Sequence, residues 1–134
     1  MDEMTPADYE SVEHAGRVLH GRGWRKNFSV NEMTDAWRRL IAEVEAGYDQ
    51  LVYEYINDLS CRDWLALAWP MLTGHVRSAR QAELDELDAR FVAATTQDAE
   101  GRLAQFYRVE AKDGWWWRRL PSRRHGEFAR DLDA

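Results

Sequence analysis

The sequence predicts a mainly α-helical single domain of about five helices, with a small C-terminal β-hairpin or extended arm. Apolar residues recur at helical spacing through most of residues 6–94, and Ser or Thr precedes several of these runs at a capping position. After residue 105 the pattern changes to short aromatic segments around an Asp-Gly pair. The length of 134 residues fits one domain with one core. Within the domain 1–134 we expect an N-terminal helix and loop at 1–28, a helical core at 29–97, a hairpin at 105–121 and a tail at 122–134.

The first two helices are expected to begin at capping boxes. Thr5 and Asp8 form a Thr-x-x-Asp box, and Ser29 and Glu32 form a Ser-x-x-Glu box. In each box the first side chain accepts a backbone N–H of the first turn, and the acidic side chain accepts one in return. The second pattern predicts a helix over residues 30–46.

The next helices are expected to be interrupted twice. Asp49 is suited to cap a two-turn helix that ends near Ile56, although Val, Tyr and Ile in this stretch also favour a strand. Ser60 is suited to cap a following helix, which Pro70 should break or kink near its end. Pro70 then starts a long helix that reaches about Ala94.

The apolar stripes of these helices and one tryptophan of the C-terminal segment are expected to form the core. Its residues are Trp37, Leu40, Ile41, Val44, Ile56, Trp64, Leu65, Leu72, Val76, Leu87, Phe91 and Trp116.

The segment DGWWWRRLP places three tryptophans next to two arginines. Asp113 and Gly114 predict a two-residue hairpin turn. Adjacent side chains on a strand point to opposite faces, so Trp116 should pack on the helices while Trp115 and Trp117 lie on the other face. Those two rings would then be covered either by the C-terminal tail or by a partner.

Three interpretations of this aromatic and basic segment remain open from the sequence. Arginine can stack on tryptophan within the fold. Trp and Arg are also enriched at protein-binding hot spots. Aromatic rings between arginines can instead stack nucleic-acid bases and follow phosphates. The nucleic-acid hypothesis would use Trp115, Trp117, Arg118, Arg119, Arg123 and Arg124.

A second candidate surface is an acidic, tyrosine-rich stretch. Its members are Tyr48, Asp49, Tyr53, Glu54, Tyr55, Asn57, Asp58 and Asp63. Buried tyrosines need hydroxyl partners, and one helix face does not readily bury all three. Exposed Tyr with Asp and Glu would bind a basic protein, whereas the two Asp positions Asp49 and Asp58 also suit ordinary helix capping.

The run DQLVYEY, Asp49 to Tyr55, resembles the binding helix of the small helical immunity proteins that block bacterial nuclease toxins. The resemblance covers fewer than ten residues. The tyrosines here are separated by one residue, whereas those of the family are adjacent. By analogy it implies a function class, inhibition of a toxin.

Composition and charge narrow the classes of function and the cellular compartments that the sequence is compatible with. The net charge of −6 argues against general nucleic-acid binding and is compatible with a basic partner. Cys61 is the single cysteine, the first ten residues lack the apolar segment of a signal peptide, and no apolar run approaches bilayer length. With arginine far more frequent than lysine, these features favour a cytoplasmic bacterial protein and no membrane association.

No nucleotide-binding, hydrolase or zinc motif occurs, so we expect no cofactor and no metal. The sequence therefore predicts a small protein-interaction module, with an immunity-type inhibitor of a basic toxin as the specific hypothesis. The alternatives are a nucleic-acid-associated regulator and an enzyme whose site is not visible in the sequence. The expected partner-binding residues are Tyr48, Asp49, Tyr53, Glu54, Asp58, Trp115, Trp117 and Arg119.

Overall fold

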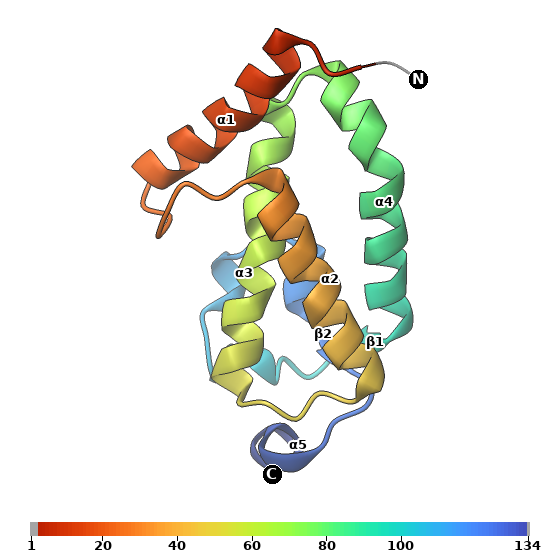
Figure 1. Cartoon of the computed structure of the whole chain (residues 1–134). Helices are drawn as coiled ribbons and strands as arrows, with labels where there is room; N and C mark the ends of the chain where they lie inside the picture. The colour runs from red at the N-terminus through yellow and green to blue at the C-terminus, as the bar shows by residue number, and fades with distance from the viewer. Residues whose placement is uncertain (1–2, 134) are drawn as a thin grey trace.

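The structure is a computed structural model that describes residues 3–133. Within them the chain forms five α-helices and two short strands (Figure 1). The elements are α1 (Pro6–Gly21), α2 (Val30–Ala46), α3 (Val52–Ala68), α4 (Gly74–Ala93), β1 (Thr95–Gln97), β2 (Arg119–Pro121) and α5 (Gly126–Leu132), with 3-10 turns η1 (Trp69–Met71), η2 (Leu103–Gln105), η3 (Val109–Ala111) and η4 (Trp115–Arg118). The mainly helical fold with a small antiparallel sheet near the C-terminus is confirmed.

Helices α2 and α3 lie side by side at the centre, with α4 beside them and α1 across one end (Figure 1). The short helix α5 lies at the opposite end, next to the loop that joins α2 to α3. Among the helices of residues 3–133, none combines bilayer-spanning length with a sufficiently apolar stretch.

Both predicted capping boxes are present. The Thr5 hydroxyl accepts from the Asp8 backbone N–H (3.2 Å) and the Asp8 carboxylate accepts from the Thr5 N–H (2.8 Å). Ser29 and Glu32 exchange the same two bonds at the start of α2, which spans the predicted residues 30–46. Gly47 ends α2 with φ = 113°, a conformation that glycine adopts without strain.

The predicted interruption between Ile56 and Ser60 is wrong, because α3 is one continuous helix of 17 residues. The Ser60 hydroxyl donates to the Asn57 carbonyl within the helix (2.6 Å) instead of capping a new one. Nor does Asp49 cap α3, whose N-cap position is Leu51 and has no side-chain bond. Packing of both halves of α3 on α2 outweighs these local capping preferences.

The break near Pro70 is confirmed. Helix α3 ends at Ala68, Pro70 lies in the 3-10 turn η1, and α4 begins at Gly74, four residues later than expected. The Thr73 hydroxyl accepts from the Val76 backbone N–H (3.2 Å) and so caps α4. The chain therefore reverses at this point and α4 returns antiparallel to α3 (Figure 1).

The small sheet has a different pairing from the predicted hairpin. Strand β2 pairs with β1, with Thr96 opposite Leu120, and the Asp113–Gly114 pair does not form a strand-to-strand turn. Residues 109–118 fold instead into the 3-10 turns η3 and η4. Gly114 is needed there because a Cβ atom would lie 2.3 Å from the ring of Trp116.

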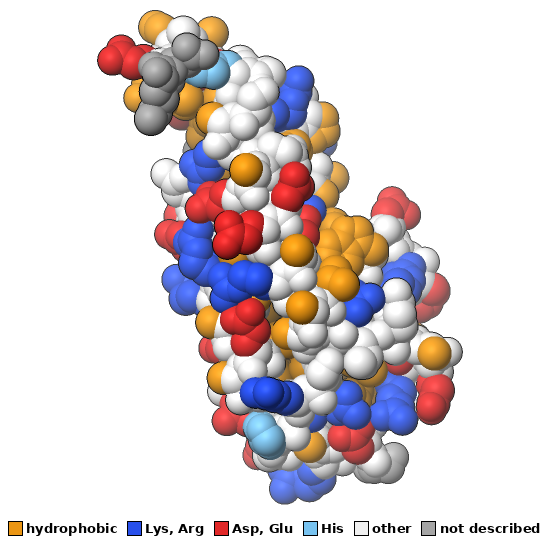
Figure 2. All heavy atoms as spheres, turned by 90° about the vertical axis from the view of Figure 1, so that its right-hand side faces the viewer, with side chains coloured by type: hydrophobic (Ala, Val, Ile, Leu, Met, Phe, Trp, Pro, Cys, Tyr) orange, Lys and Arg blue, Asp and Glu red, His pale blue; other side chains and the backbone are white. Residues whose placement is uncertain are grey.

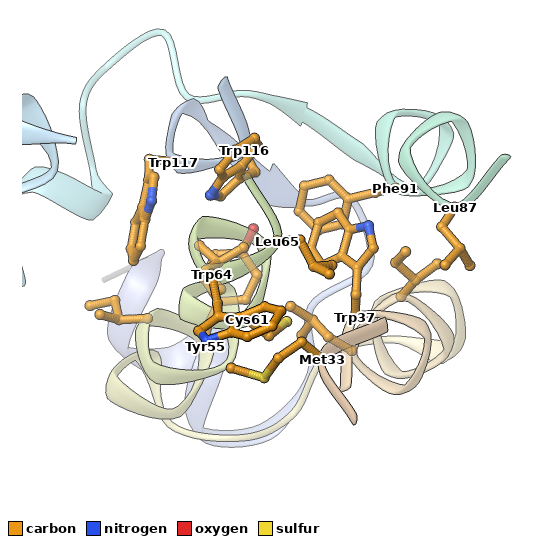
Figure 3. Packing of buried hydrophobic residues seen from close by; sticks show 14 of the residues in the cluster. Met33, Trp37, Tyr55, Cys61, Trp64, Leu65, Leu87, Phe91, Trp116 and Trp117 are labelled. Carbon is orange, nitrogen blue, oxygen red and sulfur yellow. The ribbon is translucent and has the colours of Figure 1, made fainter. Parts of the chain in front are cut away.

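All twelve predicted core residues are buried in one cluster. Figure 3 shows the rings of Trp37 and Phe91 in contact, with ring centroids 4.7 Å apart. The same core contains Trp117, which was predicted to lie on the outer face.

A buried ion pair joins the helices around this core. Arg62 of α3 donates to both carboxylate oxygens of Asp88 of α4, from Nε (2.9 Å) and from a terminal nitrogen (2.8 Å). Trp37 of α2 donates its Nε1 proton to the same carboxylate (3.0 Å). The Arg62 guanidinium lies 4.4 Å from the ring centroid of Trp116, so the C-terminal segment joins the same cluster.

Asp88→Ala should lower the free energy of unfolding by about 3–5 kcal/mol, because it leaves the buried Arg62 charge and the Trp37 N–H without their acceptor. Urea unfolding followed by tryptophan fluorescence measures the change. The matched control is Glu83→Ala, also on α4, which removes exposed ion pairs with Arg38 and Arg80 and should cost less than about 1 kcal/mol. Equal losses for the two variants would contradict a special role for the Arg62–Asp88 pair.

Candidate functional site

The acidic, tyrosine-rich stretch lies where α2 ends and α3 begins, at the end of the molecule opposite α1 (Figure 1). Two of its three tyrosines are fully buried, whereas the Tyr53 side chain is 64% exposed. The Tyr55 hydroxyl donates to the Arg119 carbonyl (2.8 Å), and the Tyr48 hydroxyl donates to the Asp58 carboxylate (3.2 Å). The prediction that Tyr48 contacts a partner is therefore wrong, because its ring packs against Phe128 and Tyr55 in the core.

The exposed part of this stretch forms a small surface that we call the α3 tip: Asp49, Leu51, Tyr53 and Glu54. Leu51 is 43% exposed and lies at the N-cap position of α3. The Tyr53 ring has an edge-to-face arrangement with the ring of Phe106, and the two ring centroids are 6.1 Å apart. The α3 tip thus presents an aromatic and an aliphatic side chain next to two carboxylates.

Asp58 lies on α3 one turn after Glu54 and is half-buried. Burial raises the pKa of its carboxyl from 3.8 to about 6, and the negative charges of Glu43 and Glu54 add to this effect. The Tyr48 hydrogen bond and the Arg39 charge act in the opposite direction and offset only part of it. Burial, followed by the charge of Asp58, also raises the pKa of the Tyr48 hydroxyl, which therefore stays protonated and donates.

The carboxylates of this end are less neutralised than those around α4. Within residues 3–133, none of Glu43, Asp49, Glu54 and Asp58 forms an ion pair with a lysine or arginine. On the face toward α4, in contrast, Figure 2 shows positive and negative side chains intermingled around an apolar patch. Pairs such as Arg90 with Glu45 neutralise that region.

A groove of about 700 Å³ runs beside this acidic end, between α2, α3 and the loop before α2. Its walls contain apolar, basic and acidic side chains: Trp24, Arg25, Lys26, Phe28, Glu32, Met33, Asp35, Ala36, Arg39, Leu40, Glu43, Asn57, Asp58, Ser60 and Cys61. Glu43 and Asp58 line both the groove and the base of the α3 tip. The groove has the size of a small-ligand site.

The sequence-based interpretation missed this groove. Trp24 and Phe28 lie in the basic segment RGWRKNF, within the N-terminal helix and loop that the sequence predicts at 1–28. Two large aromatic rings among exposed basic residues were the available signal, since an ordinary connection is mostly polar. The position of this loop next to α3 depends on tertiary packing. No local sequence pattern indicates such packing.

The three consecutive tryptophans have different environments. Trp115 is 38% exposed and rests on Phe91, while Trp116 and Trp117 are 5% and 1% exposed. Trp116 and Trp117 both donate their Nε1 protons to one oxygen of Asp63, at 2.8 and 2.7 Å. Trp116 thus packs as predicted, whereas Trp117 is not available to a partner, because the 3-10 turn points both rings inward.

The arginines of the proposed nucleic-acid arm mostly bind within the fold. Arg119, one of the expected partner-binding residues, donates to the hydroxyl and carbonyl of Thr95 (2.6 and 3.0 Å) and to the Val92 carbonyl (3.2 Å). Arg124 forms an ion pair with Asp133 at 2.9 Å. These contacts hold the C-terminal segment on α4, so Arg119 is not a free surface cation as the prediction required.

Cys61 and His75 are side chains with catalytic chemistry, and both lie in structural settings. Cys61 is buried, and burial raises the pKa of its thiol to about 12, which disfavours the nucleophilic thiolate form. His75 Nδ1 lies 2.7 Å from the Asp8 carboxylate, which also accepts from the Thr73 hydroxyl and thereby ties α1 to α4. The Thr5 backbone N–H, followed by Thr73 and His75, holds the pKa of Asp8 well below its usual range. Within residues 3–133, no three His, Cys, Asp or Glu side chains are grouped to hold a metal ion.

Comparison with protein families, with curated proteins and with solved structures finds no match to this chain.

Because Asp58 is half-buried, we expect the stability difference between Asp58→Asn and the unmodified protein to depend on pH. Its folded pKa is above its ordinary value, so the folded state binds the proton more tightly, and stability is lost as the pH rises from about 4 through about 6. Asp58→Asn stays neutral and keeps an acceptor for Tyr48. The variant should therefore gain stability relative to the unmodified protein as the pH rises from about 4 to 7.

Urea unfolding of both proteins over this pH range measures the difference. The control is Asp113→Asn, an exposed position on the C-terminal segment. A difference between Asp58→Asn and the unmodified protein that stays constant with pH would contradict the assignment.

Proposed function

We propose that this protein is a small cytoplasmic bacterial interaction module that binds a basic protein partner through the α3 tip. The observation that carries the proposal is the exposure of Tyr53 and Leu51 among carboxylates that form no ion pair within residues 3–133. Carboxylates at a helix N-terminus are partly explained by the helix dipole, which favours negative charge there. The dipole gives no reason to expose a tyrosine ring and a leucine side chain beside them.

Known interface physics supports this assignment. Tyrosine is enriched among hot-spot residues, where one ring supplies a large contact area. Unneutralised carboxylates attract a positively charged partner and accelerate its association. An aromatic centre with an acidic rim therefore matches a partner with a basic surface.

The specific form that we propose is an immunity-type inhibitor of a toxin. An enzyme that acts on nucleic acid has a positively charged surface for phosphates, and an acidic protein can occupy that surface. The likeness of the run from Asp49 to Tyr55 to the binding helix of immunity proteins supports the same class. The single, buried Cys61 is compatible with a reducing cytoplasm.

The nucleic-acid hypothesis has less support. Of its six residues, Trp115, Arg118 and Arg123 are exposed. Trp115 rests on Phe91 of α4, whereas Arg123 donates to the Glu45 carbonyl at the end of α2 (3.4 Å). Of the two rings that the hypothesis needs, only Trp115 is exposed, because Trp117 is buried, and Arg119 donates its hydrogen bonds within the fold.

Glu54→Lys and Tyr53→Ala should each weaken partner binding by about 30-fold or more, which corresponds to about 2 kcal/mol for a hot-spot residue. The partner is first captured from lysate of the source organism on the tagged protein, then purified and titrated calorimetrically. Matched controls are Glu86→Lys on α4 and Tyr9→Ala on α1, both exposed and away from the tip. Both controls should bind like the unmodified protein.

Equal affinity of all four variants for the partner would contradict the proposal. Nucleic acid in the eluate that is lost at high salt would instead favour the aromatic and basic C-terminal segment.

A further inference from the structure

The α2–α3 groove has two chemically different ends. Glu43 and Asp58 lie at the end next to the α3 tip, and Trp24 and Phe28 lie at the end formed by the loop before α2. Successive positions on α2 connect these ends, since Ala36, Leu40 and Glu43 are spaced by four and three residues and share a helix face. The groove therefore offers a continuous track from aromatic rings to carboxylates.

The floor of the groove is the outer surface of the core. Met33, Leu40 and Cys61 line it and are 6%, 2% and 5% exposed. Figure 3 shows Met33 and Cys61 close to Trp64 on one side of the core. The Trp64 ring therefore supports these two side chains of the groove floor. Ala36 is small and only half-buried, so an incoming side chain finds space above it without displacing a core residue.

The acidic end of the groove holds more carboxylates than cations. Asp58 accepts one hydrogen bond within residues 3–133, from the Tyr48 hydroxyl. The charged groups that act on it are Glu43 and Arg39 of α2 and Glu54 of α3. Arg39 is exposed and forms no ion pair within the same residues, so its charge only partly balances three carboxylates.

The aromatic end is already covered by positive charge. Arg25 and Lys26 both lie 5.2 Å from the ring centroid of Phe28, and Lys26 also pairs with Glu32 at 2.7 Å. Glu32 and Asp35 also line this end, so it holds as many carboxylates as cations, whereas Glu43, Glu54 and Asp58 outnumber Arg39 at the other end. A cation that enters the groove is therefore attracted to the acidic end. The charges therefore set the direction in which an amphipathic group lies.

We propose that the α2–α3 groove receives one arginine or lysine side chain of the basic partner together with a neighbouring apolar side chain. The cation binds between Asp58 and Glu43, and the apolar group lies over Ala36 and Leu40 toward Phe28. This inference rests on the proposed function, because it names what the partner presents next to the α3 tip. It adds a buried anchor to a surface contact.

The probe is 4-phenylbutylguanidinium, whose guanidinium and phenyl groups imitate such a pair of side chains. Its neutral isostere, 4-phenylbutylurea, is the control ligand. Titration of isotope-labelled full-length protein, followed by NMR, should give saturable shifts at the Asp58 carboxyl, the Met33 methyl and the Leu40 amide with the guanidinium. Affinity for the guanidinium should rise about tenfold from pH 5 to pH 7, because the ionised fraction of a carboxyl with a pKa of about 6 rises by that factor.

The urea should bind more weakly and without this pH dependence. Guanidinium shifts at other surfaces only, or equal binding of the two ligands, would overturn the proposal. This comparison uses the unmodified protein, so it does not depend on the folding of a variant.

Two matched pairs of variants locate the site. Ala36→Leu fills the groove and should abolish the shifts, whereas Ala42→Leu on the exposed side of α2 should preserve them. Asp58→Asn should remove the pH dependence, whereas Asp113→Asn should retain it. Thermal unfolding of each variant verifies that it is folded before titration.

The same variants separate this inference from the proposed function. A captured partner whose affinity is unaffected by Ala36→Leu and Asp58→Asn, but reduced by Glu54→Lys, would leave the function standing and overturn the groove as its anchor site. Probe binding in the groove without any captured protein would support the groove as a cation site and contradict the proposed partner.

Discussion

The bidentate ion pair between Arg62 and Asp88 is the interaction on which the arrangement of the helices depends. Asp88 of α4 accepts from Arg62 of α3 and from the indole of Trp37 of α2, so this carboxylate joins its own helix to two others. A buried ion pair contributes little net stability when it is compared with apolar residues, but it is costly to leave half-made. The ion pair therefore favours the helix packing in which both Arg62 and Trp37 reach the Asp88 carboxylate. A different register of the helices would leave the buried Arg62 charge unpaired.

The next residue of α3 performs the same role for the C-terminal segment. Asp63 accepts the indole protons of Trp116 and Trp117, and the ring of Trp116 lies against the Arg62 guanidinium. Two consecutive residues of one helix thus position α2, α4 and the segment that follows β1. Helical geometry at Arg62 and Asp63 is required for both sets of bonds, while packing of the whole of α3 on α2 keeps the helix continuous through the expected break before Ser60.

Charge is distributed unevenly over the molecule. Around α4, cations and carboxylates pair across neighbouring helices, as between Arg38 and Glu83. At the beginning of α3 the carboxylates have no such partners, and the core beneath them raises the pKa of Asp58 to about 6. Uncompensated negative charge beside the exposed Tyr53 is the feature that most supports an external basic partner, and the groove between α2 and α3 gives that partner a place to insert a side chain.

The sequence by itself determined the helical class, both N-terminal capping boxes, the break at Pro70 and twelve core residues, because these depend on local hydrogen bonds and on apolar periodicity. It also indicated the acidic stretch, although it could not tell exposed Tyr53 from buried Tyr48 and Tyr55. Tertiary structure alone decided the pairing of β1 with β2, the burial of Trp117, the internal role of Arg119 and the α2–α3 groove. The first three are set by bonds between residues far apart in the chain, such as Trp117 to Asp63 or Arg119 to Thr95, and the groove is set by the packing of α2, α3 and the loop before α2.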